Sequence, residues 1–320
     1  MLVPTQRRRP LLVLVVVAVA VSVLLAVAGV RGRLAPAGPT CAEPVEASGG
    51  HWCRIYEEDF NTPSARGSFV NAPADDWHVA PTNPYANSLR SYPDGWGTTA
   101  DWSLNFASRT TDVVAEALGA RGVLRLHGHS EKVAGRARSL GGSFYPVLAP
   151  DAADEQGQMA QTYGRYTVRF ATTGGYRPTA AGTFPVGSTE PCYGTAFLLW
   201  PTNDRWVEGE IDYPELAWGD NPSGAVHTIG RPEVNSDTFA VPATAEARYN
   251  TATIEWTPGL LVFYWNGVRV RRVTTDVPTT PFRWGFQSGG THGTPAADIS
   301  GYLYVDAITI DAYAPAAKLR

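Results

Sequence analysis

Cysteine is scarce in this chain, whose 320 residues include three, at positions 41, 53 and 192. No Cys-x-x-Cys pair and no cluster of histidines occurs, which excludes the common sequence patterns of zinc sites and redox-active thiols. Three cysteines allow one disulfide and leave one thiol over. Cys41–Cys53 would tie down the start of a domain, and Cys53–Cys192 would join that start to the core; the sequence leaves both pairings open.

Charged residues are also few, at 18% of the chain, and basic residues do not dominate. The first forty residues hold five arginines and no acid, so the remainder carries 21 basic against 30 acidic residues, a net charge of −9. Nucleic-acid binding needs a basic face, so an acidic body excludes it as the main function. Hydrophobic residues make up 44%, which indicates a folded globular chain.

A long hydrophobic run is found only at the N-terminus. Three arginines at positions 7–9 precede Leu11–Val30, a run interrupted only by Ser22 and Gly29. Such a run can span a bilayer as one helix, and the arginines keep its start in the cytoplasm. A cleaved signal peptide is the alternative, with Ala26-Val27-Ala28 as its cleavage site. Both alternatives predict a secreted or membrane-anchored protein whose folded domain lies outside the cytoplasm.

Helical periodicity is absent after this run, apart from one turn expected near residues 112–118, and no internal repeat occurs. We expect residues 1–30 to be the signal peptide or anchor, 31–51 a linker and 52–320 one domain. The 32 glycines and 25 prolines of the chain separate short strands, a pattern typical of a β-sandwich or barrel. The candidate strands cover residues 122–129, 161–171, 194–200, 207–213, 225–230, 251–256, 260–265, 268–274, 283–287 and 301–312.

Three carboxylates lie close together in Gly209-Glu210-Ile211-Asp212-Tyr213-Pro214-Glu215. Side chains alternate faces along a strand, so Glu210 and Asp212 share one face and strict alternation would turn Glu215 away. Pro214 indicates a bulge, and one bulged residue brings Glu215 back to that face. Glycosidic cleavage commonly requires two such carboxyl groups facing each other across the bond.

The Glu-x-Asp-x-x-Glu pattern resembles the catalytic signature of glycoside hydrolase family 16, which contains laminarinases and related β-glucanases. Further segments resemble strands of that family in the same order along the chain, so that the resemblance covers residues 52–313. These segments are residues 161–170, 196–201, 253–259 followed by 263–267, and 304–310.

The resemblance implies an all-β fold, a jelly-roll sandwich of two antiparallel sheets, preceded by the one N-terminal hydrophobic helix. It implies a retaining endo-glycosidase acting on a β-1,3- or mixed-linkage glucan, with Glu210 as nucleophile, Glu215 as acid/base and Asp212 bonded to the nucleophile. Because neighbouring carboxylates cannot all ionise freely, we expect one pKa among them to be raised. The alternatives are a transglycosylase on the same fold and a non-catalytic glycan-binding module, although a pure binder would not need both glutamates.

Further residues are expected to contact the polysaccharide. Flat aromatic rings stack on sugar faces, which favours Trp206 and Trp218 as sugar platforms, with Trp200 nearby. Gln287 is expected to donate to a sugar hydroxyl. His227 and Arg165 are two further candidates, each with a structural role as the alternative. His227 either reaches the leaving-group side of the cleft or packs in the fold, and Arg165 either contacts substrate or forms an ion pair.

The expected chemistry requires no cofactor. The resemblance implies a structural calcium on the convex face with Glu58 and Asp306 as candidate ligands, because oxygen ligands suit calcium; an acidic patch without an ion is the alternative. We expect a monomer whose partner is the polysaccharide, with no nucleic acid, and with a membrane only if the N-terminal segment is retained.

Overall fold

The computed structural model describes residues 40–45, 50–69, 83–97, 103–149, 152, 155–178, 189–243, 246–291 and 293–316. From Cys41 onward they belong to one compact unit. The hydrophobic run at 11–30 lies outside the described residues, so its helix stays a prediction. In the described ranges, no helix is long and apolar enough to cross a bilayer.

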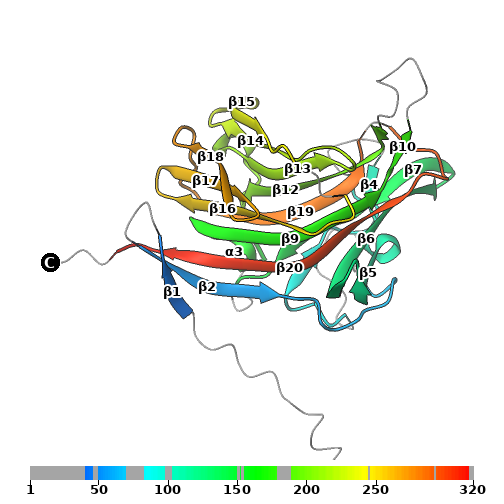
Figure 1. Ribbon diagram of the computed structural model, residues 1–320, viewed down its shortest axis with the longest axis horizontal. Helices are drawn as coiled ribbons and strands as arrows, with labels where there is room; N and C mark the ends of the chain where they lie inside the picture. The colour runs from blue at the N-terminus through cyan, green and yellow to red at the C-terminus, as the bar shows by residue number, and fades with distance from the viewer. Residues whose placement is uncertain are drawn as a thin grey trace, which may run out of the picture. The chain divides into compact units, whose positions relative to one another are not determined.

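Two large sheets form the body of this unit (Figure 1). The larger sheet has eleven described strands in the order β18-β17-β16-β9-β20-β6-β7-β4, with β2 paired to β20, β1 to β2 and β5 to β6. All its pairs with a printed register are antiparallel except the parallel pair β4–β7. Its strands are β1 (Thr40–Pro44), β2 (His51–Glu58), β4 (Ser103–Asn105), β5 (Thr111–Ala117), β6 (Ala120–Val133), β7 (Arg136–Gly141), β9 (Gly164–Gly174), β16 (Asn250–Thr257), β17 (Leu260–Trp265), β18 (Val268–Val273) and β20 (Gly301–Ala314).

The second large sheet has seven described strands in the order β15-β14-β13-β12-β19-β8-β3. They are β3 (Leu89–Ser91), β8 (Ser143–Pro146), β12 (Tyr193–Pro201), β13 (Ile211–Ala217), β14 (Ser223–Thr228), β15 (Arg231–Ala240) and β19 (Phe282–Gly290). A small pair, β10 (Tyr176–Pro178) and β11 (Thr189–Pro191), stands apart. The helical turns are α2 (Ala107–Thr110), α3 (Glu155–Met159) and η1 (Trp206–Glu208). The all-β, largely antiparallel architecture fits the expected jelly-roll sandwich.

Alternation along the strands builds the core between the two sheets. Phe197 of β12 points inward and meets Phe170 of β9 in the other sheet, with ring centroids 4.9 Å apart. Ile211 and Tyr213 of β13 are buried in the same cluster. Burial of each such large apolar side chain stabilises the fold by ~1.5–3 kcal/mol. The intervening residues of β12 and β13 therefore lie on the outer face of the seven-stranded sheet.

Two tight turns show where strand prediction succeeded and where it failed. Asn266 and Gly267 have φ of 50° and 77° and join β17 to β18, as an Asn-Gly hairpin signal predicts. The helical turn expected at 112–118 is wrong, because these residues form β5 and pair with β6. Leu118 and Gly119 make that hairpin turn with φ of 49° and 81°. Leucine seldom adopts a positive φ, so the turn has a weak sequence signal.

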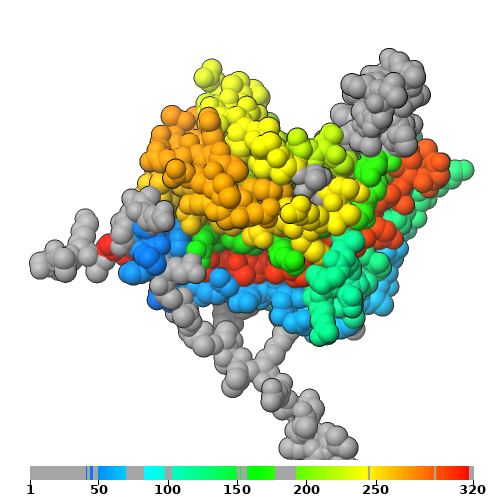
Figure 2. Space-filling model, in the orientation of Figure 1, coloured from blue at the N-terminus to red at the C-terminus, as the bar shows by residue number. Residues whose placement is uncertain are grey.

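The start of the folded unit is held by a disulfide between Cys41 and Cys53, which decides between the two pairings. Cys192 is buried and takes no part in that bond. Strand β1 lies within 31–51, the range expected as a linker, so regular structure begins before residue 52. Figure 2 shows β2 in blue and β20 in red side by side on one face, as their pairing requires.

Candidate active site

A bulge in β13 arranges the acids of the motif. Ala196 and Leu198 on β12 are opposite Glu215 and Asp212, so two steps on β12 match three on β13, and the register with β14 shifts at the same place. The bulge contains the cis peptide bond Tyr213–Pro214. Because Ala196 and Leu198 share one face of their strand, Asp212 and Glu215 also share a face. The predicted bulge is confirmed.

Glu210 stands just before this strand, so the strand predicted at 207–213 begins too early: residues 211–213 belong to β13 and residues 207–210 do not. Residues 206–208 form the 3₁₀ turn η1, and Gly209 follows it with a φ of 102°, a conformation that favours glycine. The chain runs beside β14 from Glu210 on, since the Glu210 carbonyl accepts a hydrogen bond from the His227 amide at 3.0 Å.

The Glu210 carboxylate is held by an indole. Trp206 of η1 donates its Nε1–H to Glu210 Oε2 at 2.6 Å. The Glu210 side chain is only 14% exposed, so this hydrogen bond acts where water screens little. A bond from a neutral donor to a carboxylate favours the charged form and fixes the direction in which the carboxylate points.

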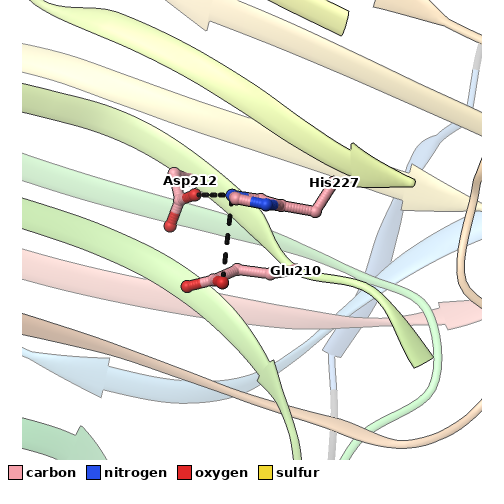
Figure 3. A group of neighbouring side chains, drawn as sticks. All are labelled: Glu210, Asp212 and His227. Atoms are coloured by element: carbon pink, nitrogen blue, oxygen red, sulfur yellow. Dashed lines mark hydrogen bonds and ion pairs between the residues drawn. The ribbon is translucent and has the colours of Figure 1, made fainter. Parts of the chain in front are cut away.

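His227 links Glu210 and Asp212 (Figure 3). Its Nε2 lies 2.9 Å from Asp212 Oδ2 and 3.8 Å from Glu210 Oε2. Its Nδ1 lies 2.6 Å from the carbonyl oxygen of Pro232 in β15. The imidazole therefore contacts the acids and the backbone, and the ring is 16% exposed. Of its two expected roles, the structure favours the packed one over a direct contact with the leaving group.

Burial and mutual charge perturb the protonation of this group. Desolvation, followed by the charge of Asp212, raises the pKa of Glu210 above its ordinary value, although His227 and the Trp206 hydrogen bond act against the rise. Burial acts to lower the pKa of His227, but the bond to Asp212 and the Pro232 carbonyl outweigh it, and its pKa is raised. Glu210 and His227 therefore both hold their protons more tightly than the free side chains do. The raised pKa of Glu210 agrees with the expectation that neighbouring carboxylates cannot all ionise freely.

Glu215 lies further along the same face and opens onto a pocket of about 480 Å³. The residue is exposed, but the pocket walls displace water from its carboxyl, and this desolvation, followed by the charge of Asp212, raises its pKa. Gln287 of β19 lines the same pocket and, like Glu215, is paired with Ala196. Sequence reasoning missed the other polar lining residues, which come from neighbouring strands and turns: Thr195, Asp220, Asn221, Ser223, Ser288 and Thr291.

The expected tryptophan platforms have different outcomes. Trp206 is 39% exposed and stacks on Trp200, with ring centroids 6.3 Å apart and an interplanar angle of 19°. Trp218 is fully buried, and its Nε1–H donates to Thr195 Oγ1 at 3.0 Å. A ring without exposed surface cannot stack on a sugar, so the expectation for Trp218 is wrong. This pair, with Trp206 exposed and Trp200 half-buried, lies on the Glu210 side of the acids.

Arg165 does not lie near these residues. It projects from β9 of the other sheet, where its Nε donates to Asp311 Oδ2 at 2.9 Å. Asp311 is 2% exposed and also accepts from Arg54 Nε at 2.7 Å. A buried carboxylate needs such partners, so the ion pair is the role that the structure supports. The expectation of a substrate contact for Arg165 is wrong, because β9 belongs to the opposite layer of the sandwich.

The candidate calcium ligands have other partners. Glu58 accepts from Ser88 Oγ at 2.9 Å and from the Phe60 amide at 3.2 Å, and Asp306 forms an ion pair with Arg169. The guanidinium already balances the Asp306 charge, so these residues do not fit a calcium site together. In the part of the chain that the structure describes, one group could satisfy metal spacing: Glu210, Asp212 and His227, within 4.8 Å of one another. A hydrogen-bonded imidazole between carboxylates has the same spacing and is complete without an ion.

Comparison with known proteins finds solved structures that share the fold of this chain. No family model and no curated protein matches the chain. Among solved structures, SCLam, a non-specific endo-β-1,3(4)-glucanase from family GH16, is 17% identical, with a TM-score of 0.57 over 87% of this chain and 95% of that chain. An endo-β-1,3-glucanase from Pyrococcus furiosus is 15% identical, with a TM-score of 0.57 over 86% and 99%.

A third structure, the β-glucanase of Bacillus licheniformis, is 15% identical, with a TM-score of 0.52 over 80% of this chain and 96% of that chain. These similarities extend over nearly the whole length of the three glucanases. The resemblance to glycoside hydrolase family 16 is therefore confirmed for the fold.

Proposed function

We propose that this chain is a family 16 glycoside hydrolase, a retaining endo-glycosidase that cleaves a β-1,3- or mixed-linkage glucan. The observation that carries the proposal is the bulge of β13, which brings Asp212 and Glu215 to one outer face beside Glu210. Retaining glycosidases need two carboxyl groups ~5–5.5 Å apart. The bulge turns Glu215 to the face on which Glu210 and Asp212 lie, as two carboxyl groups acting on one bond require.

In the first step, a carboxylate oxygen of Glu210 forms a bond to the anomeric carbon. The bond from that carbon to the leaving sugar oxygen breaks, and Glu215 gives its proton to that oxygen. In the second step, water attacks the anomeric carbon, its proton passes to Glu215, and the bond to Glu210 breaks. The raised pKa of Glu215 supports its part, because a general acid must hold its proton at working pH.

The surroundings of the acids also support a polymer as substrate. Trp206, which is exposed, and its half-buried partner Trp200 lie toward Glu210. The pocket around Glu215 is lined mainly by small or hydrogen-bonding residues such as Gln287 and Ser223. Sugar residues on both sides of the cleaved bond would thus find contacts, which favours cleavage within a chain.

Reducing-end release from a panel of β-1,3-glucans, mixed-linkage glucans and galactans tests this function. Wild type should act on a β-glucan, and Glu210→Gln and Glu215→Gln should each lose ~10⁴-fold in kcat. Glu116→Gln, an exposed acid on β5, is the matched control and should retain activity. A variant of Glu210 or Glu215 within tenfold of wild type would exclude the assigned role.

The anomeric configuration of the first product is a second readout. Proton NMR of early hydrolysis should show retention, because two displacements at the same carbon restore its configuration. Initial inversion would mean that a water stands between the carboxyl groups and that Glu210 acts as a base. Transfer to an added sugar in place of water would identify the transglycosylase alternative.

A further inference from the structure

Both nitrogens of His227 face oxygen atoms, and these accept hydrogen bonds when Asp212 is ionised. Nδ1 faces the Pro232 carbonyl, and Nε2 faces the carboxylate of Asp212. A neutral imidazole has one donor and one acceptor, so it would leave one of these oxygens facing a bare lone pair. The imidazolium form, with a proton on each nitrogen, satisfies both contacts.

We propose that His227 is a positioning residue, an imidazolium that orients Asp212 and supplies the positive charge that lets Glu210 ionise. This role rests on the proposed function, in which Glu210 attacks as a carboxylate. It replaces the expected contact of His227 with the leaving group, because both ring nitrogens are already bonded to the protein.

The fold holds the ring from three elements. His227 extends from β14, where the register with β15 shifts on both sides of it, and this irregularity places the Pro232 carbonyl at Nδ1. Trp206 of η1 lies beside the ring, with centroids 5.9 Å apart. The turn after β14 is tied to η1 as well, since the Gly230 amide donates to the Val207 carbonyl at 2.8 Å.

Among the residues that the structure describes, the charged groups that act on His227 are acids. Asp212 and Glu210 lie nearest, and Glu215 is further along β13 and also feels its charge. The other elements packed against the ring contribute a carbonyl from β15 and an indole from η1. Without the imidazolium, three carboxyl groups would share one poorly hydrated face, and ionisation of Glu210 would become more costly.

The kinetic test compares His227→Gln with His129→Gln. The His129 side chain is 18% exposed, against 16% for His227, but it lies on β6 in the other sheet. His227→Gln should shift the acid limb of kcat/KM to higher pH by about one unit and lower kcat on that limb about tenfold, as loss of one nearby opposite charge implies. KM should stay within twofold, and His129→Gln should match wild type in all respects.

Two kinetic outcomes would overturn the proposal. A raised KM with an unmoved acid limb would make His227 a substrate contact. An equal loss at every pH would make it a structural residue only. Glutamine can still donate one hydrogen bond to Asp212, so this variant separates the charge from the bond and is expected to fold.

The second measurement does not depend on catalysis. Nitrogen NMR of the ¹⁵N-histidine-labelled protein, with His227 assigned by its absence from His227→Gln, should show both ring nitrogens protonated at neutral pH. Asp212→Asn should lower the pKa of His227, because it removes the charge that favours the imidazolium. A neutral His227 ring at neutral pH would refute the proposal, whereas wild type without activity on any glycan, with a normal imidazolium signal, would refute only the proposed function.

Discussion

In the proposed mechanism, Glu210 must carry a charge in a place where burial disfavours charge. Its side chain is 14% exposed and lies beside Asp212, and both conditions raise its pKa. Two neighbours act in the other direction: Trp206 donates a hydrogen bond to its carboxylate, and His227 lies 3.8 Å away. The pKa of the proposed nucleophile is thus set by opposing effects of its surroundings, and such perturbed pKa values are common at catalytic groups.

This balance has a consequence for stability. The folded state holds the Glu210 proton more tightly than the unfolded chain does, so the stability gained from that proton is present at low pH and lost as pH rises through the folded pKa. Glu210→Gln keeps the shape without the ionisation. Its Tm should equal that of wild type near pH 4 and exceed it at neutral pH, by ~2–4 °C for each kcal/mol recovered. Thermal unfolding from pH 4 to 8 measures the difference, and a difference independent of pH would contradict the raised pKa.

Trp206 combines two functions that substitution can separate. Trp206→Phe keeps an exposed ring but removes the Nε1–H that reaches Glu210, so we expect kcat to fall and the acid limb of kcat/KM to move to higher pH, with KM nearly unchanged. Trp206→Ala also removes the ring, so its KM should rise in addition. Steady-state kinetics on a soluble β-glucan give both parameters. Equal KM for the two variants would show that the ring does not stack on sugar.

At the scale of single elements, the bulge in β13 was predictable and its surroundings were not. Pro214 between two acids signals a bulge, and the motif requires it for a shared face. The partner of Asp212 could not be predicted in the same way. The His227 ring reaches Asp212 because of two register shifts between β14 and β15, and such shifts depend on how whole strands pair.

Turns and burial limited the sequence prediction for similar reasons. The sequence identifies Trp218 as an aromatic residue just after β13, but it does not say whether the ring points into the core or toward solvent. In the structure the ring lies in the core. The strand predicted at 207–213 begins only at Ile211, because the 3₁₀ turn before it ends at Gly209, which has a positive φ. Leu260–Trp265, a continuous run of apolar residues between two clear turns, was predicted with the bounds that the structure shows.

Strand β19 makes a close contact that should be sensitive to one added carbon. A Cβ at Gly285 would lie 2.3 Å from the Tyr145 ring and 2.7 Å from the Phe144 carbonyl, both on β8. Gly285→Ala should lower the unfolding free energy by ~1–3 kcal/mol, as overpacking in a dense region does. Gly97→Ala is the control, since nothing lies within 4 Å of its Cβ position. Urea unfolding compares the two, and equal midpoints would show that β8 moves aside at little cost.

At the scale of the whole molecule, two features suggest where the protein works. The disulfide Cys41–Cys53 joins β1 to β2, and such bonds persist mainly in oxidising compartments. Arginines precede the apolar run at 11–30, an arrangement that directs the following chain across a membrane. We propose that the domain acts outside the cytoplasm, either released after cleavage near Ala28 or retained by the uncleaved segment. The intact mass of the protein from its native host would separate these two cases.

Thiol counting tests the compartment. In the folded protein, alkylation should be slow, because Cys192 is buried and the other two cysteines are bonded. After unfolding without reductant, protein from its native host should take up one label, at Cys192, and after reduction it should take up three. Reduction should also lower the unfolding midpoint, because closing a loop of the length between Cys41 and Cys53 stabilises a fold by ~3 kcal/mol in the chain-entropy model. Three labels before reduction would show that the disulfide does not form in the host, and the proposed location outside the cytoplasm would then lose its structural support.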